Sequence, residues 1–274
     1  MRFETLASGR ITVATEFLPL LRARGLDSFE RVMAVTEGKV MRDFPGRRTV
    51  RLEVASSVVY LKRYLSGYLT PAARLLRLVR WPGAEDEALR EWQMLQALRA
   101  CGVPTATPVA VGQDKTGGQV VRSFLMTAEI TGGIEGDKFI RTLAAAPRRR
   151  LLRRVAEMAR GLHAAGFVHK DYYLCHVLMV PAKSDPELFL IDLQRVVLPC
   201  CLRERWRVKD LAALAYSALK SGATRSDLLA AFRAYCSMAR LTDADRALAH
   251  KVLRRVAWLR TRTPRHDTTF VQLD

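Results

Sequence analysis

HKDYYLCH (His169–His176) and, soon after it, LIDLQRV (Leu190–Val196) decide the fold expected of this chain. The first segment opens a tight polar loop that contains Asp171, and the second places Asp192 at the end of a short apolar strand. The two carboxylates are 21 positions apart (192 − 171). This order is typical of enzymes that transfer phosphate, in which one Asp orients the acceptor hydroxyl and a second holds Mg²⁺ on the nucleotide phosphates.

The composition is that of a globular protein with a large positive charge. The 274 residues are 49% hydrophobic, which is enough for one large core or two modest ones, and this length favours two lobes. There are 45 Lys and Arg residues against 27 Asp and Glu, a formal net charge of +18. Such a charge attracts polyanions: nucleic acid, an anionic membrane face or a phosphorylated glycolipid. The charge alone does not choose among them.

Neither disulfide bonds nor a membrane span are predicted. The five cysteines are odd in number and form no CxxC pair, which favours reduced thiols in the cytosol. The N-terminus lacks the apolar region of a signal peptide, and the segment Ile11–Leu21 is interrupted by Glu16 and Pro19. We therefore expect a cytoplasmic protein.

The first half of the chain predicts a small β-rich lobe with one main helix. Runs rich in Val, Leu and Tyr, separated by turn residues, indicate an antiparallel meander, and a helical pattern follows it. The predicted elements are strands at Met33–Arg42, Arg47–Val54 and Ser57–Tyr64, a helix from Glu85 to the Cys101–Pro104 stop, and strands at Val109–Gly112 and Val120–Ala128.

The second half predicts helices. Leu151, Val155, Met158 and Leu162 form the buried stripe of a helix that stops at Gly166. His163, on that helix, is interpreted as a surface residue. Three further helices are predicted, each with an Asp as its N-cap. The capping residues are Asp210, Asp227, and Asp243 or Asp245.

Together these patterns predict an α+β fold of two lobes. The first lobe, residues 1–128, carries the strands and is expected to bind a nucleotide. The second, residues 129–274, is mostly helical and is expected to hold the catalytic loop, the metal site and the acceptor. The lobes join near residues 128–133, where we expect Ala128 and Ile130 to contact the nucleotide.

Phosphate transfer from a nucleotide requires a cation on the phosphates, a metal ion and a carboxylate that orients the attacking hydroxyl. Lys62, in the third strand, is the candidate cation, and Glu91 on the next helix is expected to hold its ammonium group. Asp171 is the candidate catalytic carboxylate. Asp192 supplies the hard oxygen atoms that Mg²⁺ prefers.

Six segments occur in an order that is informative when taken together. They are RRTVRLEV (Arg47–Val54), YLKRY (Tyr60–Tyr64), REWQMLQALRACGVPT (Arg90–Thr105), HKDYYLCHVLM (His169–Met179), IDLQR (Ile191–Arg195) and VKDLAALAYS (Val208–Ser217). With them the chain resembles the lipopolysaccharide kinase family of the WaaP/InaA type over about residues 28–260. The resemblance implies a protein-kinase-like fold, ATP and Mg²⁺ as cofactors, and phosphorylation of heptose in the inner core of bacterial lipopolysaccharide.

The resemblance also assigns roles. It maps the catalytic Asp onto Asp171, a metal-binding Asp onto Asp192, and the ATP-contacting Lys and Glu onto Lys62 and Glu91. His176 stands where protein kinases carry Asn, and we expect it to bind the metal, to hydrogen-bond Asp192 or to contact a metal-bound water. Two further residues are expected to support the site. They are His169, as a buried ring, and Asp210, which braces the catalytic loop.

Two segments depart from the protein-kinase pattern. The loop Asp43–Arg48 has one glycine where protein kinases have three, so Arg47 or Arg48 is expected to replace a backbone phosphate cradle with charge. Asp192 is followed by Leu193-Gln194, which removes the glycine hinge of the usual switch. We also expect no control by an activation loop, because Cys200, Cys201 and Trp206 crowd the short interval before Asp210.

The predicted substrate is the glycolipid of lipid A and core saccharide, with peripheral contact at the anionic cytoplasmic face of the inner membrane. No nucleic-acid partner is expected. Two alternatives remain open: a kinase-like phosphotransferase for another small molecule or a protein, and a catalytically inactive kinase-like binding module. The presence of Lys62, Asp171 and Asp192 argues against the inactive module.

Overall fold

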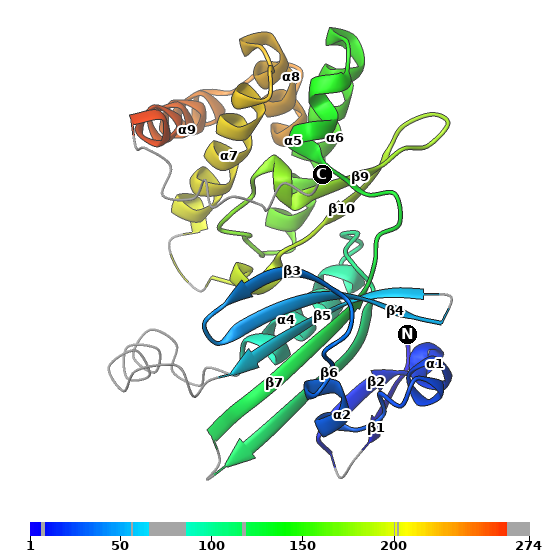
Figure 1. The fold of residues 1–274 in the computed structure, drawn as a ribbon. Helices are drawn as coiled ribbons and strands as arrows, with labels where there is room; N and C mark the ends of the chain where they lie inside the picture. The colour runs from blue at the N-terminus through cyan, green and yellow to red at the C-terminus, as the bar shows by residue number, and fades with distance from the viewer. Residues whose placement is uncertain are drawn as a thin grey trace. The chain divides into compact units, whose positions relative to one another are not determined.

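The computed structural model describes residues 1–6, 9–55, 57–65, 86–116, 119–199, 201 and 203–261. The chain divides into two compact units, the first formed by Met1–Ala97 and Ala106–Glu129 and the second by Leu98–Thr105 and Ile130–Asp274. The first unit is rich in strands and the second is mostly helical, which confirms the predicted α+β class (Figure 1). Among the described residues, no helix has the length and apolar content needed to cross a bilayer.

The described part of the first unit is built on a seven-stranded antiparallel sheet. Its strand order is β1-β2-β6-β7-β5-β4-β3, so the last strands of the unit lie at the centre of the sheet. The strands are β1 (Phe3–Leu6), β2 (Ile11–Ala14), β3 (Lys39–Phe44), β4 (Arg47–Val54), β5 (Ser57–Leu65), β6 (Pro108–Thr116) and β7 (Gln119–Ala128).

The predicted strand Met33–Arg42 is wrong in its first half. Helix α2 (Phe29–Met33), which Ser28 caps by accepting a hydrogen bond from Arg31 N at 3.4 Å, ends at Met33, and the residues from Ala34 to Gly38 are neither helix nor strand. Strand β3 begins only at Lys39. Gly38, at φ +96°, makes the entry to the strand, and a Cβ there would lie 2.6 Å from the Arg51 carbonyl. The predicted strand Arg47–Val54 matches β4.

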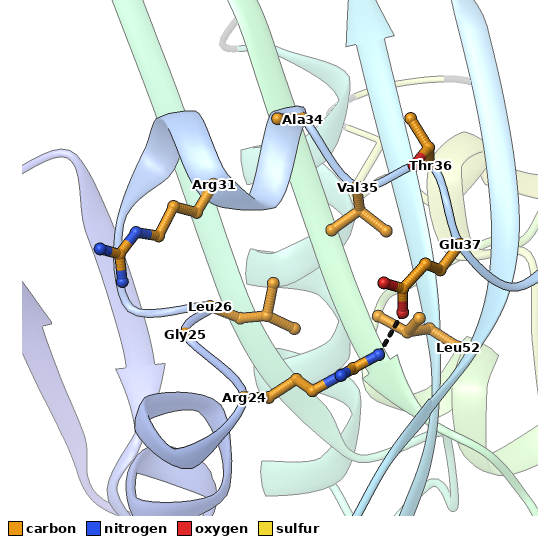
Figure 2. Close-up of a pocket in the computed structure, with 9 residues that line it drawn as sticks. All are labelled: Arg24, Gly25, Leu26, Arg31, Ala34, Val35, Thr36, Glu37 and Leu52. Carbon is orange, nitrogen blue, oxygen red and sulfur yellow. Dashed lines mark hydrogen bonds and ion pairs between the residues drawn. The ribbon is translucent and has the colours of Figure 1, made fainter.

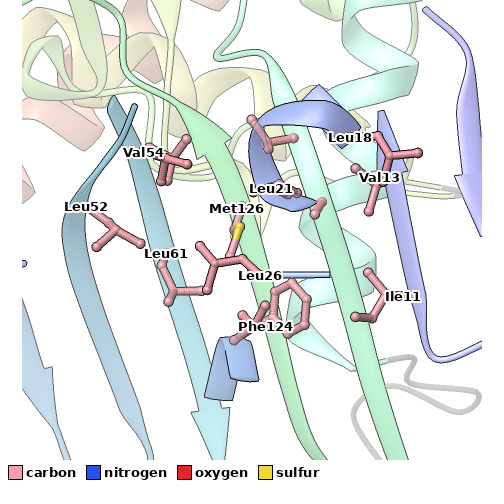
Figure 3. Close-up of a cluster of buried hydrophobic side chains, with 14 of the residues drawn as sticks. Ile11, Val13, Leu18, Leu21, Leu26, Leu52, Val54, Leu61, Phe124 and Met126 are labelled. Atoms are coloured by element: carbon pink, nitrogen blue, oxygen red, sulfur yellow. The ribbon is translucent and has the colours of Figure 1, made fainter. Parts of the chain in front are cut away.

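The two faces of this sheet have different coverings. One face packs against α1 (Leu18–Ala23) and α2, and their buried side chains join those of the central strands in one apolar core (Figure 3). Helix α4 (Glu87–Ala100) covers the opposite face. Since side chains alternate along a strand, the register of β4 and β5 decides which residues face α4.

The second unit consists of a small sheet and a set of helices. Its described strands are β8 (Ile134–Glu135), β9 (Val177–Val180) and β10 (Glu187–Leu190), in the order β10-β9-β8. Helix α6 packs against α8, and α7 packs against α9. The helices are α5 (Gly136–Phe139), α6 (Ala145–Ala164), α7 (Arg203–Lys220), α8 (Arg225–Cys236) and α9 (Asp243–Thr261). Short 3₁₀ turns lie at Ile140–Thr142, Leu174–His176 and Leu193–Arg195. One further 3₁₀ turn, Thr15–Phe17, belongs to the first unit.

The predicted Asp caps are corrected by these helices. Asp210 caps no helix, because α7 begins at Arg203 and Asp210 is buried well inside it. Asp227 is the third residue of α8, where it forms a capping box with Thr224. Thr242 and Asp245 make the same reciprocal hydrogen bonds at the start of α9.

Asp227 also links two helices. Its fully buried carboxylate lies 3.0 Å from Arg148 and 3.0 Å from Arg149, both on α6. Burial alone would raise the pKa of Asp227, but hydrogen bonds from Thr224 and from the two arginines outweigh it and lower the pKa to about 2. Two arginines of the basic run at the start of α6 therefore hold α8 in place.

We expect Asp227→Asn to lower the free energy of unfolding by about 3 kcal/mol at pH 7, because it removes a fully buried carboxylate and leaves the largely buried Arg148 and the half-exposed Arg149 without their charge partner. The folded pKa is lowered, so this stabilisation is complete above the pKa of the unfolded carboxyl and is lost as the pH falls toward 2. Urea unfolding followed by circular dichroism should show a gap between wild type and variant that narrows between pH 6 and pH 3.

Asp185→Asn is the matched control. It removes a partner of Arg150 in a pair whose side chains are 38% and 61% exposed, and it should cost less than about 1 kcal/mol. Equal losses in the two variants would contradict the role given to Asp227.

Candidate active site

Lys62 and Glu91 are brought together within the first unit. Lys62 Nζ, on β5, lies 2.6 Å from Glu91 Oε1, on α4, and the Glu91 side chain is only 3% exposed. The Tyr64 hydroxyl donates to the other carboxylate oxygen at 3.5 Å. A carboxylate held from both sides in this way fixes the position of the ammonium group.

The register of β4 and β5 separates Arg47 from Arg48. Thr49 pairs with Lys62, and Arg47 lies two residues from Thr49, so Arg47 shares the face of Lys62. Its guanidinium lies 5.6 Å from the Tyr64 ring centroid. Arg48 pairs with Arg63 on the opposite face. Of the two arginines predicted to replace the glycine cradle, only Arg47 is therefore on the face that carries the lysine.

The end of β7 is held by a cluster of three polar side chains. Glu129 accepts two hydrogen bonds from Arg51, at 2.6 and 2.9 Å, and a third from the Tyr60 hydroxyl at 3.2 Å. Ala128, just before it, donates its N–H to the Thr107 carbonyl at 2.8 Å. This cluster, which was not predicted, fixes the backbone at the end of the first unit.

Ile130 begins the second unit. Its carbonyl accepts a hydrogen bond from Gly133 N at 3.0 Å, which closes a turn. A Cβ at Gly133 would lie 2.9 Å from that carbonyl, so the turn requires glycine. Ala128 and Ile130 therefore belong to segments whose backbones are fixed by local hydrogen bonds.

Helix α7 holds the loop His169–His176 at two points. The Asp210 carboxylate accepts from the His169 backbone N–H at 2.7 Å, and the Ser217 hydroxyl accepts from Leu174 N at 3.0 Å. The buried His169 ring spans to the next segment, because its Nε2 donates to the Ile191 carbonyl at 3.0 Å. Burial lowers the pKa of His169, which favours the neutral ring.

The interpretation of His163 as a surface residue is wrong. Its side chain is 3% exposed and lies 3.2 Å from Asp210 on one side and 3.0 Å from the Tyr235 hydroxyl on the other. Arg207 donates to that hydroxyl at 2.9 Å. The sequence contained a signal for this burial. The spacing of one buried helical face, steps of four, three and four, joins Leu152, Ala156, Ala159 and His163.

Asp171 is flanked by two cations that the sequence did not single out. Arg195 lies 2.5 Å from one carboxylate oxygen, and Lys209 Nζ lies 3.7 Å from the other. Arg195 follows Asp192 by three residues, and Lys209 directly precedes Asp210. Their nearness to known motif residues was visible in the sequence. Their direction toward Asp171 depends on tertiary packing.

His176 and Asp192 face each other with atoms that suit a cation. His176 Nδ1 lies 2.7 Å from the Asp171 carbonyl, which can only accept, so Nδ1 carries the hydrogen and Nε2 of the neutral ring carries a lone pair. That Nε2 lies 3.7 Å from Asp192 Oδ2. The backbone of Asp192 is left-handed, with φ +56°.

The candidate metal site at Asp192 and His176 has few protein ligands. The described residues contain no group of three or more His, Cys, Asp or Glu side chains arranged to hold a metal. Mg²⁺ is commonly bound through one or two carboxylates together with substrate phosphates and water, so Asp192 fits this ion, whereas the His176 imidazole is the weaker ligand for it.

A pocket of about 410 Å³ lies elsewhere in the first unit. Leu26, Val35 and Leu52 give it apolar walls, and Arg24 forms an ion pair with Glu37 beside them (Figure 2). Leu52 belongs to the face of β4 opposite to that of Lys62 and α4. This pocket is therefore not part of the candidate site.

Known proteins share both the sequence pattern and the fold. The chain is 34% identical over 223 residues to "Lipopolysaccharide core heptose(I) kinase WaaP" of Escherichia coli, covering 77% of this chain and 82% of that protein. It is 36% identical over 220 residues to the protein of the same name from Pseudomonas aeruginosa, covering 77% and 81%.

A solved structure described as "WaaP in complex with acyl carrier protein" superposes with a TM-score of 0.69 at 31% identity, covering 95% of this chain and 97% of that one. This likeness confirms the kinase-like fold. A family profile described as "Lipopolysaccharide kinase (Kdo/WaaP) family" matches residues 32–235. The chain therefore belongs to the lipopolysaccharide kinase (Kdo/WaaP) family.

Proposed function

We propose that this chain is an ATP-dependent kinase that transfers the γ-phosphate to a heptose hydroxyl of the lipopolysaccharide core. The observation that carries the proposal is Asp171, a carboxylate on a loop anchored by two hydrogen bonds to α7 and flanked by Arg195 and Lys209. The relatives named as core heptose(I) kinases support the choice of acceptor.

In this proposal the first unit binds the nucleotide. Lys62 places its charge on the α and β phosphates, and Glu91 keeps the ammonium in position before the nucleotide arrives. Arg47, on the same face of the sheet, adds a second cation where a glycine-rich loop would otherwise donate backbone N–H groups. Ala128 and Ile130 contact the base.

The second unit binds the acceptor. Asp171 accepts a hydrogen bond from the attacking hydroxyl and takes its proton late in the transfer, while Arg195 and Lys209 orient the carboxylate. Asp192 and His176 would hold Mg²⁺, which when bound neutralises charge on the phosphates. His169 and Asp210 hold the loop in place, through the hydrogen bonds from the His169 backbone to Asp210 and from the His169 ring to the Ile191 carbonyl.

The positive charge of the chain fits a glycolipid acceptor at a membrane. A net charge of +18 favours an anionic surface and substrate over a neutral one. We therefore place the protein in the cytoplasm, in peripheral contact with the inner membrane.

The direct test is transfer of phosphate from Mg·ATP to core oligosaccharide prepared from cells that lack this protein. Wild-type protein should add one phosphate, seen as a single mass increment. We expect Asp171→Asn to reduce turnover by about a thousandfold, because the amide cannot take the hydroxyl proton. The variant should keep its melting temperature and its affinity for Mg·ATP.

Near-normal turnover by Asp171→Asn would remove Asp171 from this role. Wild-type protein that binds no Mg·ATP in calorimetry would favour the inactive binding module instead.

Glu91→Gln tests the nucleotide half separately. Without the buried carboxylate, the Lys62 ammonium is no longer held, and we expect kcat/KM for ATP to fall by about ten- to a hundredfold. Glu87→Gln, at the start of the same helix, is the control and should leave the value within about twofold. A Glu91 variant with unchanged kcat/KM for ATP would contradict the pairing as a functional one.

His176→Asn tests the metal ligand. Imidazole favours later transition metals, whereas an amide oxygen favours Mg²⁺, so the substitution should lower the activity ratio of Co²⁺ to Mg²⁺. We expect activity with Mg²⁺ to stay within about tenfold of wild type. Activity titrations with each metal provide the measurement, and an unchanged ratio would show that His176 does not bind the metal.

A further inference from the structure

The N-terminal strand β1 lies at one edge of the seven-stranded sheet and contacts α4 through a pair of aromatic rings. The ring centroids of Phe3 and Trp92 are 5.0 Å apart, and the rings meet edge to face at an angle of 61°. Trp92 is buried and Phe3 is partly buried. Trp92 directly follows Glu91, the residue that holds Lys62. The first strand of the chain therefore touches the helix that positions the lysine.

Helix α4 is held from two sides. Successive residues of an α-helix point about 100° apart, so Glu91 and Trp92 leave the helix in different directions. Glu91 reaches Lys62 on β5, whereas Trp92 meets Phe3 on β1. In the order β1-β2-β6-β7-β5, three described strands separate β1 from β5. The two contacts are therefore well apart, and a rotation of the helix that moved Trp92 would also move Glu91.

Strand β1 is anchored independently of α4. Thr15 donates its backbone N–H at 3.0 Å and its hydroxyl at 3.3 Å to the Arg2 carbonyl. Phe3 pairs with Ala14 in the ladder of β1 and β2, and β2 in turn pairs with β6. Leu6, three residues after Phe3, points to the opposite face of the sheet and packs against the apolar core. The strand thus holds Phe3 in a fixed place.

The pair of Lys62 and Glu91 is sensitive to the position of α4. Lys62 is fixed in the sheet, because β5 pairs with β4 on one side and with β7 on the other. Its partner comes from the helix, across a distance of 2.6 Å. A hydrogen-bonded ion pair weakens when either partner is displaced, so a functional pair needs packing that fixes both elements. Packing of β1 on α4 supplies this for the helix.

We propose that Phe3 is a positioning residue for nucleotide binding, which acts through Trp92 to hold α4 in the rotation at which Glu91 meets Lys62. The inference rests on the proposed function and adds the N-terminal strand to the parts on which that function depends. Without the Phe3 ring, Trp92 loses its packing partner on β1. Helix α4 then turns more freely, and Glu91 holds the lysine for a smaller fraction of the time.

The experiment compares Phe3→Ala with Leu6→Ala, a truncation on the same strand that faces away from α4. Phe3→Ala should lower kcat/KM for ATP by about five- to twentyfold, lower the affinity for Mg·ATP in calorimetry by a similar factor, and leave the KM for core oligosaccharide within about twofold. Leu6→Ala should leave kcat/KM for ATP within about twofold, although both variants should lower the melting temperature. Phe3→Leu retains apolar bulk against Trp92 and should restore most of the loss.

A double-mutant cycle with Glu91→Gln tests the route of the effect. Since Phe3 acts through Glu91 in this proposal, adding Phe3→Ala to the Glu91→Gln protein should change kcat/KM for ATP by less than about twofold. A full additional loss in that background would show that Phe3 acts by another route, and it would overturn the proposal.

Two further results would also overturn it: an unchanged kcat/KM for ATP in Phe3→Ala, or an equal loss in Leu6→Ala. Failure of wild type to transfer phosphate to core oligosaccharide would instead overturn the proposed function. The two kinds of failure can be told apart, because calorimetry measures the binding of Mg·ATP without an acceptor.

Discussion

The second unit depends on one buried interaction, the hydrogen bond from the His169 backbone N–H to the Asp210 carboxylate. A buried carboxylate is costly unless donors surround it, and in Asp210 one oxygen, Oδ2, receives both the His169 N–H and the His163 ring, whereas the buried Oδ1 has no hydrogen-bond partner among the described residues. Ser217, two helical turns further along α7, fixes the loop at a second point. The position of Asp171 thus follows from the anchoring of its loop to a regular helix.

The first unit also uses a buried carboxylate to hold another group in position. Glu91 is as well buried as Asp210 and is likewise used to hold another charged or polar group, in this case Lys62. Arg51, Tyr60 and Glu129 form a third such group at the end of β7. In each unit the groups that would handle phosphate are positioned by charge pairs made inside that unit, before any ligand binds, which is the arrangement that electrostatic catalysis requires.

The sequence predicted the features that depend on local order. Strand β4 and helix α4 follow from alternation and helical period, and Asp171 and Asp192 follow from their place in short motifs. The first half of the predicted strand Met33–Arg42 was wrong, because α2 reaches Met33 and β3 begins only after Gly38, whose positive φ makes the entry to the strand. The sequence predicts Asp210 as a cap because the first turns of α7 are polar, and no apolar stripe marks the true start of the helix at Arg203. Arg195 and Lys209 could not be assigned, since the direction of a long side chain is set by packing between elements distant in sequence.

Leu193 carries a consequence for anyone who seeks to inhibit this protein. It directly follows Asp192, is almost fully buried and begins the 3₁₀ turn Leu193–Arg195, so this segment is anchored by apolar packing. A ligand can stabilise only a conformation that the chain populates, and flipping Asp192 outward would expose that leucine to water. Compounds that need this segment displaced would therefore bind at the additional cost of exposing Leu193 to water.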